Sequence, residues 1–270
     1  MVPSWVPDVP PDGLPEVDRP LDPDGPPADP PNLGAVATPT GGPVPIAPVG
    51  RFRPARTSLG KFASSGGTGH MRRGVGHYFR SGLGGAGTAG RRFGGTARTA
   101  GRLYGLLGGG GGAGADANAR LNRDVLAGRS AREVIDAIVE AARPVDGTQD
   151  SEASRNSVND ALSELMDRYP DADLLSLSEE ERLFVTERFV SKDVYHRFML
   201  DIGSVIQDKA PSLSVALSRL KEAREYIRET VAAAFRSVAQ AGQRLTAGRV
   251  SQLVQQALVD AFDVFAGYAE

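Results

Sequence analysis

The chain has 270 residues and a mass of 28.4 kDa, enough for one or two domains, and its net charge of −2 hides three segments of unlike composition. It contains no cysteine, which excludes disulfides, thiol nucleophiles and cysteine-ligated metal sites. No apolar run approaches the roughly 18–20 residues of a membrane-spanning helix. The N-terminus lacks the basic and apolar regions of a secretory signal. The lack of cysteine suits the reducing cytoplasm, which is the expected location.

Residues 1–50 form an acidic, proline-rich arm. They hold 15 of the 19 prolines and seven acids against one base. Proline removes backbone donors, and apolar residues are too sparse to offset the cost of ordering the chain, so a disordered, extended arm is predicted. Trp5 is the only tryptophan and stands among Val2, Pro3 and Val6. An aromatic side chain in such an arm can anchor it in a partner's groove, and the alternative is a stray apolar residue in a tail.

Residues 51–115 form a basic, glycine-rich segment. They hold 21 of the 33 glycines and eleven Lys or Arg without a single acid. Apolar residues spaced by three or four on both sides of Ser64–Gly69 predict two short helices, although each interior glycine weakens a helix by about 1 kcal/mol. From Ala86 to Leu107 a stripe of small and aromatic residues keeps this spacing. It predicts a helix that another helix can approach closely, with arginines on a different face.

Residues 116–270 are predicted to form an all-α bundle. Apolar spacing indicates helices near 116–127, 131–143, 152–168, 178–189, 192–209, 213–241 and 247–266. Ser130 with Glu133, and Ser178 with Glu181, have the spacing of capping boxes at helix starts. The fold class is therefore an all-α C-terminal helical bundle, preceded by a disordered arm and a partly helical Gly/Arg-rich segment. This bundle is expected to fold without the first 115 residues.

The sequence predicts no catalytic, cofactor or metal site. Matches to G-x-G-x-x-G, such as Gly82–Gly87, lack the preceding strand and the later acid of a dinucleotide site. His70 and His77 could share a helical face, but no carboxylate lies nearby to complete a metal site. No nucleophile, base and orienting group can be assembled, so the protein is predicted not to be an enzyme.

The positive charge of residues 51–115 is the strongest physical signal. Its cations could contact phosphates while interleaved aromatic rings stack on bases, as in a nucleic-acid-binding adaptor. Those rings belong to Phe52, Phe62, Tyr78, Phe79, Phe93 and Tyr104. Docking on an acidic protein surface, in this chain or on a partner, is the favoured alternative. A membrane-active effector, with the glycine-rich helix on anionic lipid, is the third.

Several strings of the sequence resemble the QatB family, the accessory subunit of the Qat anti-phage defence systems. The strings are Val2–Val6 (VPSWV), Arg51–Gly66 (RFRPARTSLGKFASSG), Gly76–Gly94 (GHYFRSGLGGAGTAGRRFG) and the glycine-rich joint after Leu107. The resemblance implies a system of four components: an ATPase, this protein, a QueC-like enzyme and a TatD-like nuclease. It implies a non-catalytic subunit that binds the QueC-like (QatC-type) enzyme and serves as its protein partner or substrate.

Contacts with the QueC-like enzyme are then expected in two places. The arm would supply Val2, Pro3, Trp5 and Val6, and the basic segment would supply Arg51, Phe52, Arg53, Arg56, Leu59, Lys61 and Phe62. The ATPase and the TatD-like nuclease are further candidate partners, whereas nucleic acid and membranes are less favoured. Family members begin with a Gly-Thr-Ser-type lead, but this chain begins Met1-Val2, so no residue is named for covalent modification.

Overall fold

The computed structural model describes most of the chain after the arm. The described residues are 49–108, 121, 123–239 and 245–269. Contacts divide the chain into two units, Met1–Ile46 and Ala47–Glu270, and every described residue belongs to the second unit. All of the predicted disordered arm except its last two residues, Val49 and Gly50, therefore lies outside the described residues.

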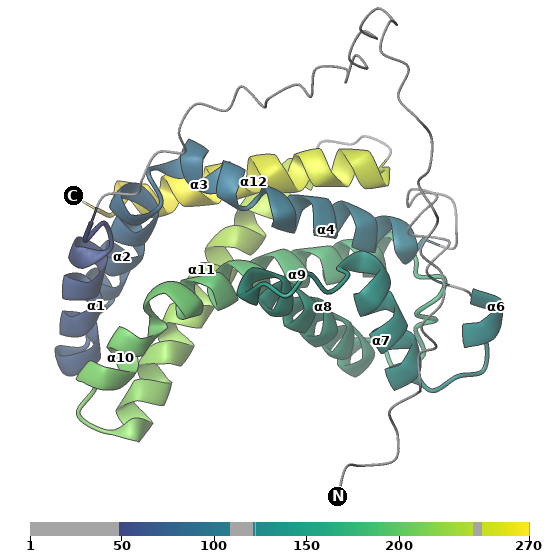
Figure 1. The fold of residues 1–270 in the computed structure, drawn as a ribbon, viewed down its shortest axis with the longest axis horizontal. Coiled ribbons are helices and arrows are strands. Elements are labelled where there is room, and N and C mark those ends of the chain that lie inside the picture. Colours follow the sequence, from purple (N-terminus) through teal and green to yellow (C-terminus); the bar gives the residue numbers. More distant parts are fainter. Residues whose placement is uncertain (1–48, 109–120, 122, 240–244, 270) are drawn as a thin grey trace, which may run out of the picture. The chain divides into compact units, whose positions relative to one another are not determined.

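The described residues form helices and no strand, which confirms the all-α class. Figure 1 shows how the helices are arranged. In chain order they are α1 (Arg53–Ser65), α2 (Thr68–His77), the π-helix η1 (Tyr78–Gly82), α3 (Ala86–Arg92), α4 (Gly94–Leu106), α6 (Arg123–Leu126), α7 (Ala131–Ala142), α8 (Gln149–Arg168), α9 (Glu179–Phe198), the π-helix η2 (Met199–Gly203), α10 (Ser204–Lys209), α11 (Leu213–Ala239) and α12 (Ala247–Gly267).

Both predicted capping boxes form. At the start of α7 the Glu133 amide donates to Ser130 Oγ at 3.3 Å, and the Ser130 amide donates to Glu133 Oε2 at 3.0 Å. The same reciprocal pair joins Ser178 and Glu181 at the start of α9. Each box satisfies two backbone amides that the first helical turn leaves without partners. The hydrogen bonds from Ser130 also lower the pKa of the Glu133 carboxyl group.

The helices predicted near 178–189 and 192–209 are joined in the structure. α9 continues through the break expected between residues 189 and 192. There the Ser191 hydroxyl donates to the Glu187 carbonyl of the same helix at 2.8 Å. A serine that bonds to its own helix backbone does not end the helix. The change of geometry comes later, where η2 widens the helix for one turn before α10. The sequence carries no local signal for that π-helical turn.

The small-residue stripe of the basic segment packs against α12. It is divided at Phe93 into α3 and α4, and both helices run along α12 in Figure 1. A Cβ atom on Gly101 would lie 2.5 Å from the Ala247 carbonyl oxygen, and one on Gly90 would lie 2.6 Å from Val259 Cγ2. The glycines therefore permit the close helix approach that the stripe predicted, and the exposed Arg98 lies on another face.

Aromatic rings from the basic segment complete the core of the bundle. Phe79 stacks on Phe262 and Phe265 of α12, with ring centroids 4.3 and 4.9 Å apart. Phe93 meets Phe262 edge to face at 5.0 Å. The composition predicted a boundary near residue 115, and among the described residues one hydrophobic core includes residues on both sides of that position.

A buried polar network ties α4 to α8 and α9. Asp193 is fully buried and accepts hydrogen bonds from Thr96 Oγ1 at 2.5 Å and Ser154 Oγ at 2.7 Å. Arg197 lies 3.5 Å from the same carboxylate and 3.3 Å from Asp150. A buried charge is stable only when it is paired and hydrogen-bonded, and Asp193 meets both conditions. The network therefore fixes the basic segment to the bundle at a defined position.

Candidate functional site

A basic groove runs between α1 and α10. It has a volume of about 840 Å³, and its walls carry five cationic side chains. These five, which we call the groove cations, are Arg51, Arg53, Arg56, Lys61 and Lys209. Four of them were predicted to contact a partner. Lys209 was missed, because only the packing of α10 beside α1 brings this distant residue to the groove.

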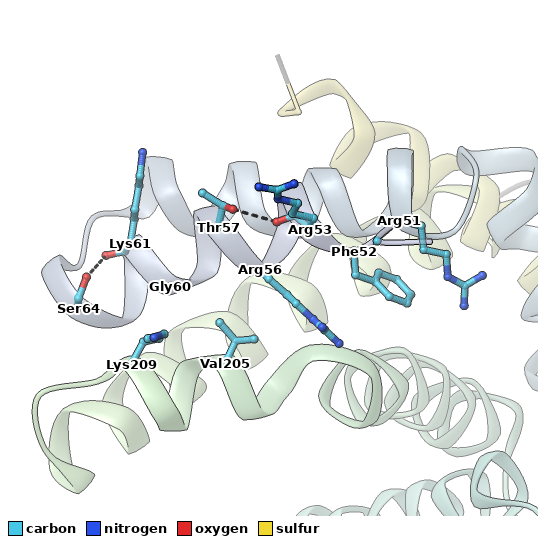
Figure 2. A pocket seen from close by; sticks show the side chains of 11 residues that line it. Arg51, Phe52, Arg53, Arg56, Thr57, Gly60, Lys61, Ser64, Val205 and Lys209 are labelled. Atoms are coloured by element: carbon cyan, nitrogen blue, oxygen red, sulfur yellow. Dashed lines mark hydrogen bonds between the residues drawn. The ribbon is translucent and has the colours of Figure 1, made fainter. Parts of the chain in front are cut away.

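The sequence of α1 explains why its cations face outward. Pro54 stands in the first turn, where its missing amide costs no hydrogen bond. Ala55, Leu59, Phe62 and Ala63 recur at helical spacing and are buried in the core. The cations between them are left on the exposed side of the helix. Figure 2 shows the Arg56 side chain extending toward the α10 side, whereas Lys61 projects away from it.

Two residues predicted to contact the partner are part of the core instead. Leu59 and Phe62 have no exposed surface, and the guanidinium of Arg219 on α11 lies over the Phe62 ring at 5.3 Å. A partner cannot reach either side chain without unfolding α1. Their role is to hold the helix that carries the cations. The predicted arm contacts at Val2, Pro3, Trp5 and Val6 lie outside the described residues.

Phe52 links the groove to the core. Its ring stacks on Tyr78 with centroids 5.6 Å apart, and the Arg51 guanidinium lies 4.7 Å from the centre of the Phe52 ring. Gly82 approaches the same ring so closely that a Cβ atom there would collide with it. This packing fixes where the chain enters α1 and orients Arg51 at one end of the groove.

The charges of the groove cations are not neutralised by ion pairs among the described residues. Within the described part of the chain none of the five forms an ion pair, whereas Arg188, Lys192 and Arg236 elsewhere all pair with glutamates. Unpaired cations grouped on a rigid surface attract an acidic partner and speed its association. The groove therefore has the electrostatics of a docking site for acidic groups.

The aromatic residues of the basic segment do not form a platform for bases. Five of the six rings expected to stack on nucleobases are buried: Phe62, Tyr78, Phe79, Phe93 and Tyr104. Phe52 is partly buried and already stacked on Tyr78. Binding of single strands depends on accessible rings as well as cations. The expectation of interleaved stacking was wrong, because the spacing that suggested it serves the core.

The glycine-rich stripe is likewise unavailable to lipid. The hydrophobic core buries four members of the stripe: Phe93, Ala97, Ala100 and Tyr104. No helix in the described part of the chain combines the length and the hydropathy that a membrane crossing needs. The apolar face proposed for a membrane-active helix is therefore used within the protein.

One serine lies beside a histidine, but its geometry is that of a helix contact. Ser157 Oγ lies 2.8 Å from His196 Nδ1 and also 2.8 Å from the Ala153 carbonyl oxygen. The hydroxyl donates to that carbonyl, and its contact with the imidazole ring joins α8 to α9. Ser157 has no exposed surface for a substrate to reach. Nowhere in the described ranges do three His, Cys, Asp or Glu side chains gather closely enough to hold a metal ion.

Comparison with known proteins identifies the family. The curated proteins and the solved structures contain no significant match to the chain. A family model described as QatB, Qat anti-phage system associated protein, matches residues 84–265, well over half of the chain. The match covers α3, α4 and all the later helices into α12, whereas the groove helix α1 precedes it. The chain therefore belongs to the QatB family of proteins associated with the Qat anti-phage system.

Proposed function

We propose that this protein is a non-enzymatic docking subunit of a Qat anti-phage system, and that its groove cations bind an acidic surface of a QueC-like enzyme. The observation that carries the proposal is the set of five cations that line the groove between α1 and α10 and form no ion pair within the described residues. α1 is held by its buried face, so the cations are presented without a large ordering cost.

The arm has a second role in this proposal. The arm ends at Gly50, and both Gly50 and the next residue, Arg51, line the groove. Trp5 would anchor the arm on the enzyme while the groove sets orientation, so the arm is also the candidate for modification by that enzyme. Co-expression with the QueC-like enzyme followed by intact-protein mass spectrometry tests this part: an added mass on the N-terminal peptide supports it, and an unmodified arm in a stable complex contradicts it.

The groove is tested by titration against the purified QueC-like enzyme at two ionic strengths. Substituting Arg51, Arg53, Arg56 and Lys61 by Ala should slow association and flatten its salt dependence, because exposed charges act mainly on the association rate. The matched control replaces Arg91, Arg98, Arg102 and Arg132, four exposed cations on α3, α4 and α7. If the control loses as much affinity as the groove variant, net charge and not the groove drives binding.

A nucleic-acid-binding adaptor for the TatD-like nuclease is the second candidate. The same five cations favour it, since contacts with phosphates need only accessible positive charge. The burial of the aromatic rings disfavours it. Salt-dependent binding of a single-stranded oligonucleotide, lost in the groove variant and kept in the control, would make this candidate the better one.

A further inference from the structure

A second, smaller cavity lies where the two π-helices meet. It has a volume of about 300 Å³ and is lined by Tyr78 of η1 and Asp201 of η2, among others. The Tyr78 hydroxyl donates to Asp201 Oδ2 at 2.7 Å. Burial raises the pKa of Tyr78 well above its ordinary value, so the hydroxyl keeps its proton and remains a donor. π-Helical turns are rare and occur frequently at functional sites, and here two of them share one cavity.

Three arginines from distant parts of the chain converge on this cavity. They are Arg51 before α1, Arg92 at the end of α3 and Arg197 on α9. Arg197 is already neutralised, because it pairs with Asp193 and Asp150 and lies 4.8 Å from the centre of the Phe93 ring. It serves as a fixed wall of the cavity.

Arg51 and Arg92 are different. Among the described residues neither forms an ion pair, although both line the cavity. Of the two carboxylates in the wall, Asp150 is paired with Arg197, and Asp201 accepts the Tyr78 hydroxyl. Three guanidinium groups and two carboxylates therefore line the cavity, and Arg51 and Arg92 are the two guanidinium groups that no ion pair within the described residues engages.

We infer that this cavity binds the oxyanion group of a small ligand, a phosphate or a carboxylate, between Arg51 and Arg92. Guanidinium groups bind such groups through paired, charge-assisted hydrogen bonds. The volume is at the lower end of the range for small-molecule sites. The inference does not depend on the docking function, because a small ligand could occupy the cavity whether or not a protein binds the groove.

The test is isothermal titration calorimetry of the full chain with inorganic phosphate and, separately, with citrate. Saturable one-site binding of either probe is expected, and the probe that binds more tightly tells phosphate from carboxylate recognition. Arg92→Gln should weaken it by roughly tenfold or more, because the substitution removes a charge-assisted hydrogen bond to the ligand. Arg92 is exposed, so the variant should fold, and an unchanged melting curve verifies this.

Two controls keep the result specific. Arg98→Gln removes an exposed charge of α4 outside the cavity and should bind the probes like the parent. The double substitution of Arg53 and Lys61 by Ala removes groove charge and should also leave binding unchanged. The inference is overturned if neither probe saturates, if Arg98→Gln loses as much as Arg92→Gln, or if the groove substitutions abolish binding. Because Arg92 does not line the groove, its effect separates this site from the docking surface.

Discussion

The two ends of the basic segment, α1 and α4, both carry cations, but α1 contains one glycine and α4 contains four, and their buried faces differ. α1 buries large side chains, Leu59 and Phe62, and leaves its cations beside a groove. α4 buries small residues as well as Leu103 and Tyr104, and Gly101 lies almost in contact with the backbone of α12. Glycine in α4 therefore serves close packing, whereas the docking that we propose for α1 depends on the cations that its buried face leaves exposed. The basic, glycine-rich composition of the segment as a whole does not tell which of its helices leaves cations beside a groove and which packs closely on another helix.

Removing the whole basic segment should have the largest effect. A chain that begins at residue 121 lacks Phe79 and Phe93, the aromatic partners of Phe262. We expect it to lose its cooperative thermal transition, contrary to the independent folding that the sequence suggested. A chain that begins at residue 47 keeps every described helix and should melt like the full protein. Circular dichroism melts of the two chains test this expectation. A cooperative transition in the shorter chain would show that the C-terminal bundle folds without the basic segment.

Asp193→Ala should be the most damaging single substitution that we consider. It leaves Arg197 without its buried partner and removes the acceptor for Thr96 and Ser154, so the free energy of unfolding should fall by about 3–5 kcal/mol. Denaturant unfolding measures it. Asp160→Ala on the exposed side of α8 is the control and should change stability by less than about 0.5 kcal/mol. A small loss for Asp193→Ala would show that the network does not hold α4 in place.

Two glycine substitutions sharpen the contrast between α4 and α1. Gly101→Ala would place a methyl group 2.5 Å from the Ala247 carbonyl oxygen, and such overpacking typically costs about 1–3 kcal/mol. In Gly60→Ala the nearest atom is Lys209 Cγ at 3.8 Å, an ordinary contact, so the better helix propensity of alanine should raise stability by up to about 1 kcal/mol. Thermal melts of the pair should shift in opposite directions. Equal shifts would mean that α4 is not closely packed on α12.

Trp5→Ala compares the contribution of the arm with that of the α1 groove to binding of the QueC-like enzyme. A buried aromatic anchor can contribute about 2 kcal/mol or more, so the complex with the QueC-like enzyme should weaken roughly 30-fold. Leu14→Ala, another apolar residue of the arm, is the control and should bind nearly as well as the parent. If Trp5→Ala binds like the parent while the groove variant fails at every salt concentration, the arm is only a linker and the groove is the interface.

Local patterns in the sequence predicted the local structure well. The capping boxes at Ser130 and Ser178 and the limits of α12 follow from interactions between residues a few positions apart. The helical spacing in α1 also predicted which residues share a face. It did not tell which face is buried, so Leu59 and Phe62 were assigned to the partner and not to the core.

The groove and the cavity could not be predicted because they depend on long-range packing. Lys209 reaches the groove from α10, and Arg197 reaches the cavity from α9. Neither position shows a sequence pattern that relates it to Arg51. The π-helical turns at Tyr78–Gly82 and Met199–Gly203 depend on how their side chains pack, and apolar periodicity cannot resolve a single widened turn.

Gly90 and Gly101, two of the tight glycines of the α12 interface, imply different freedom to change during evolution. The obstacle facing Gly90 is made of side chains, Val259 and Gln255, so a larger residue at 90 can be tolerated when these become smaller. The nearest obstacle facing Gly101 is the Ala247 carbonyl oxygen, which every amino acid carries. Relatives with this helix packing should therefore show paired changes at 90 and 259, while position 101 stays glycine whatever happens in α12.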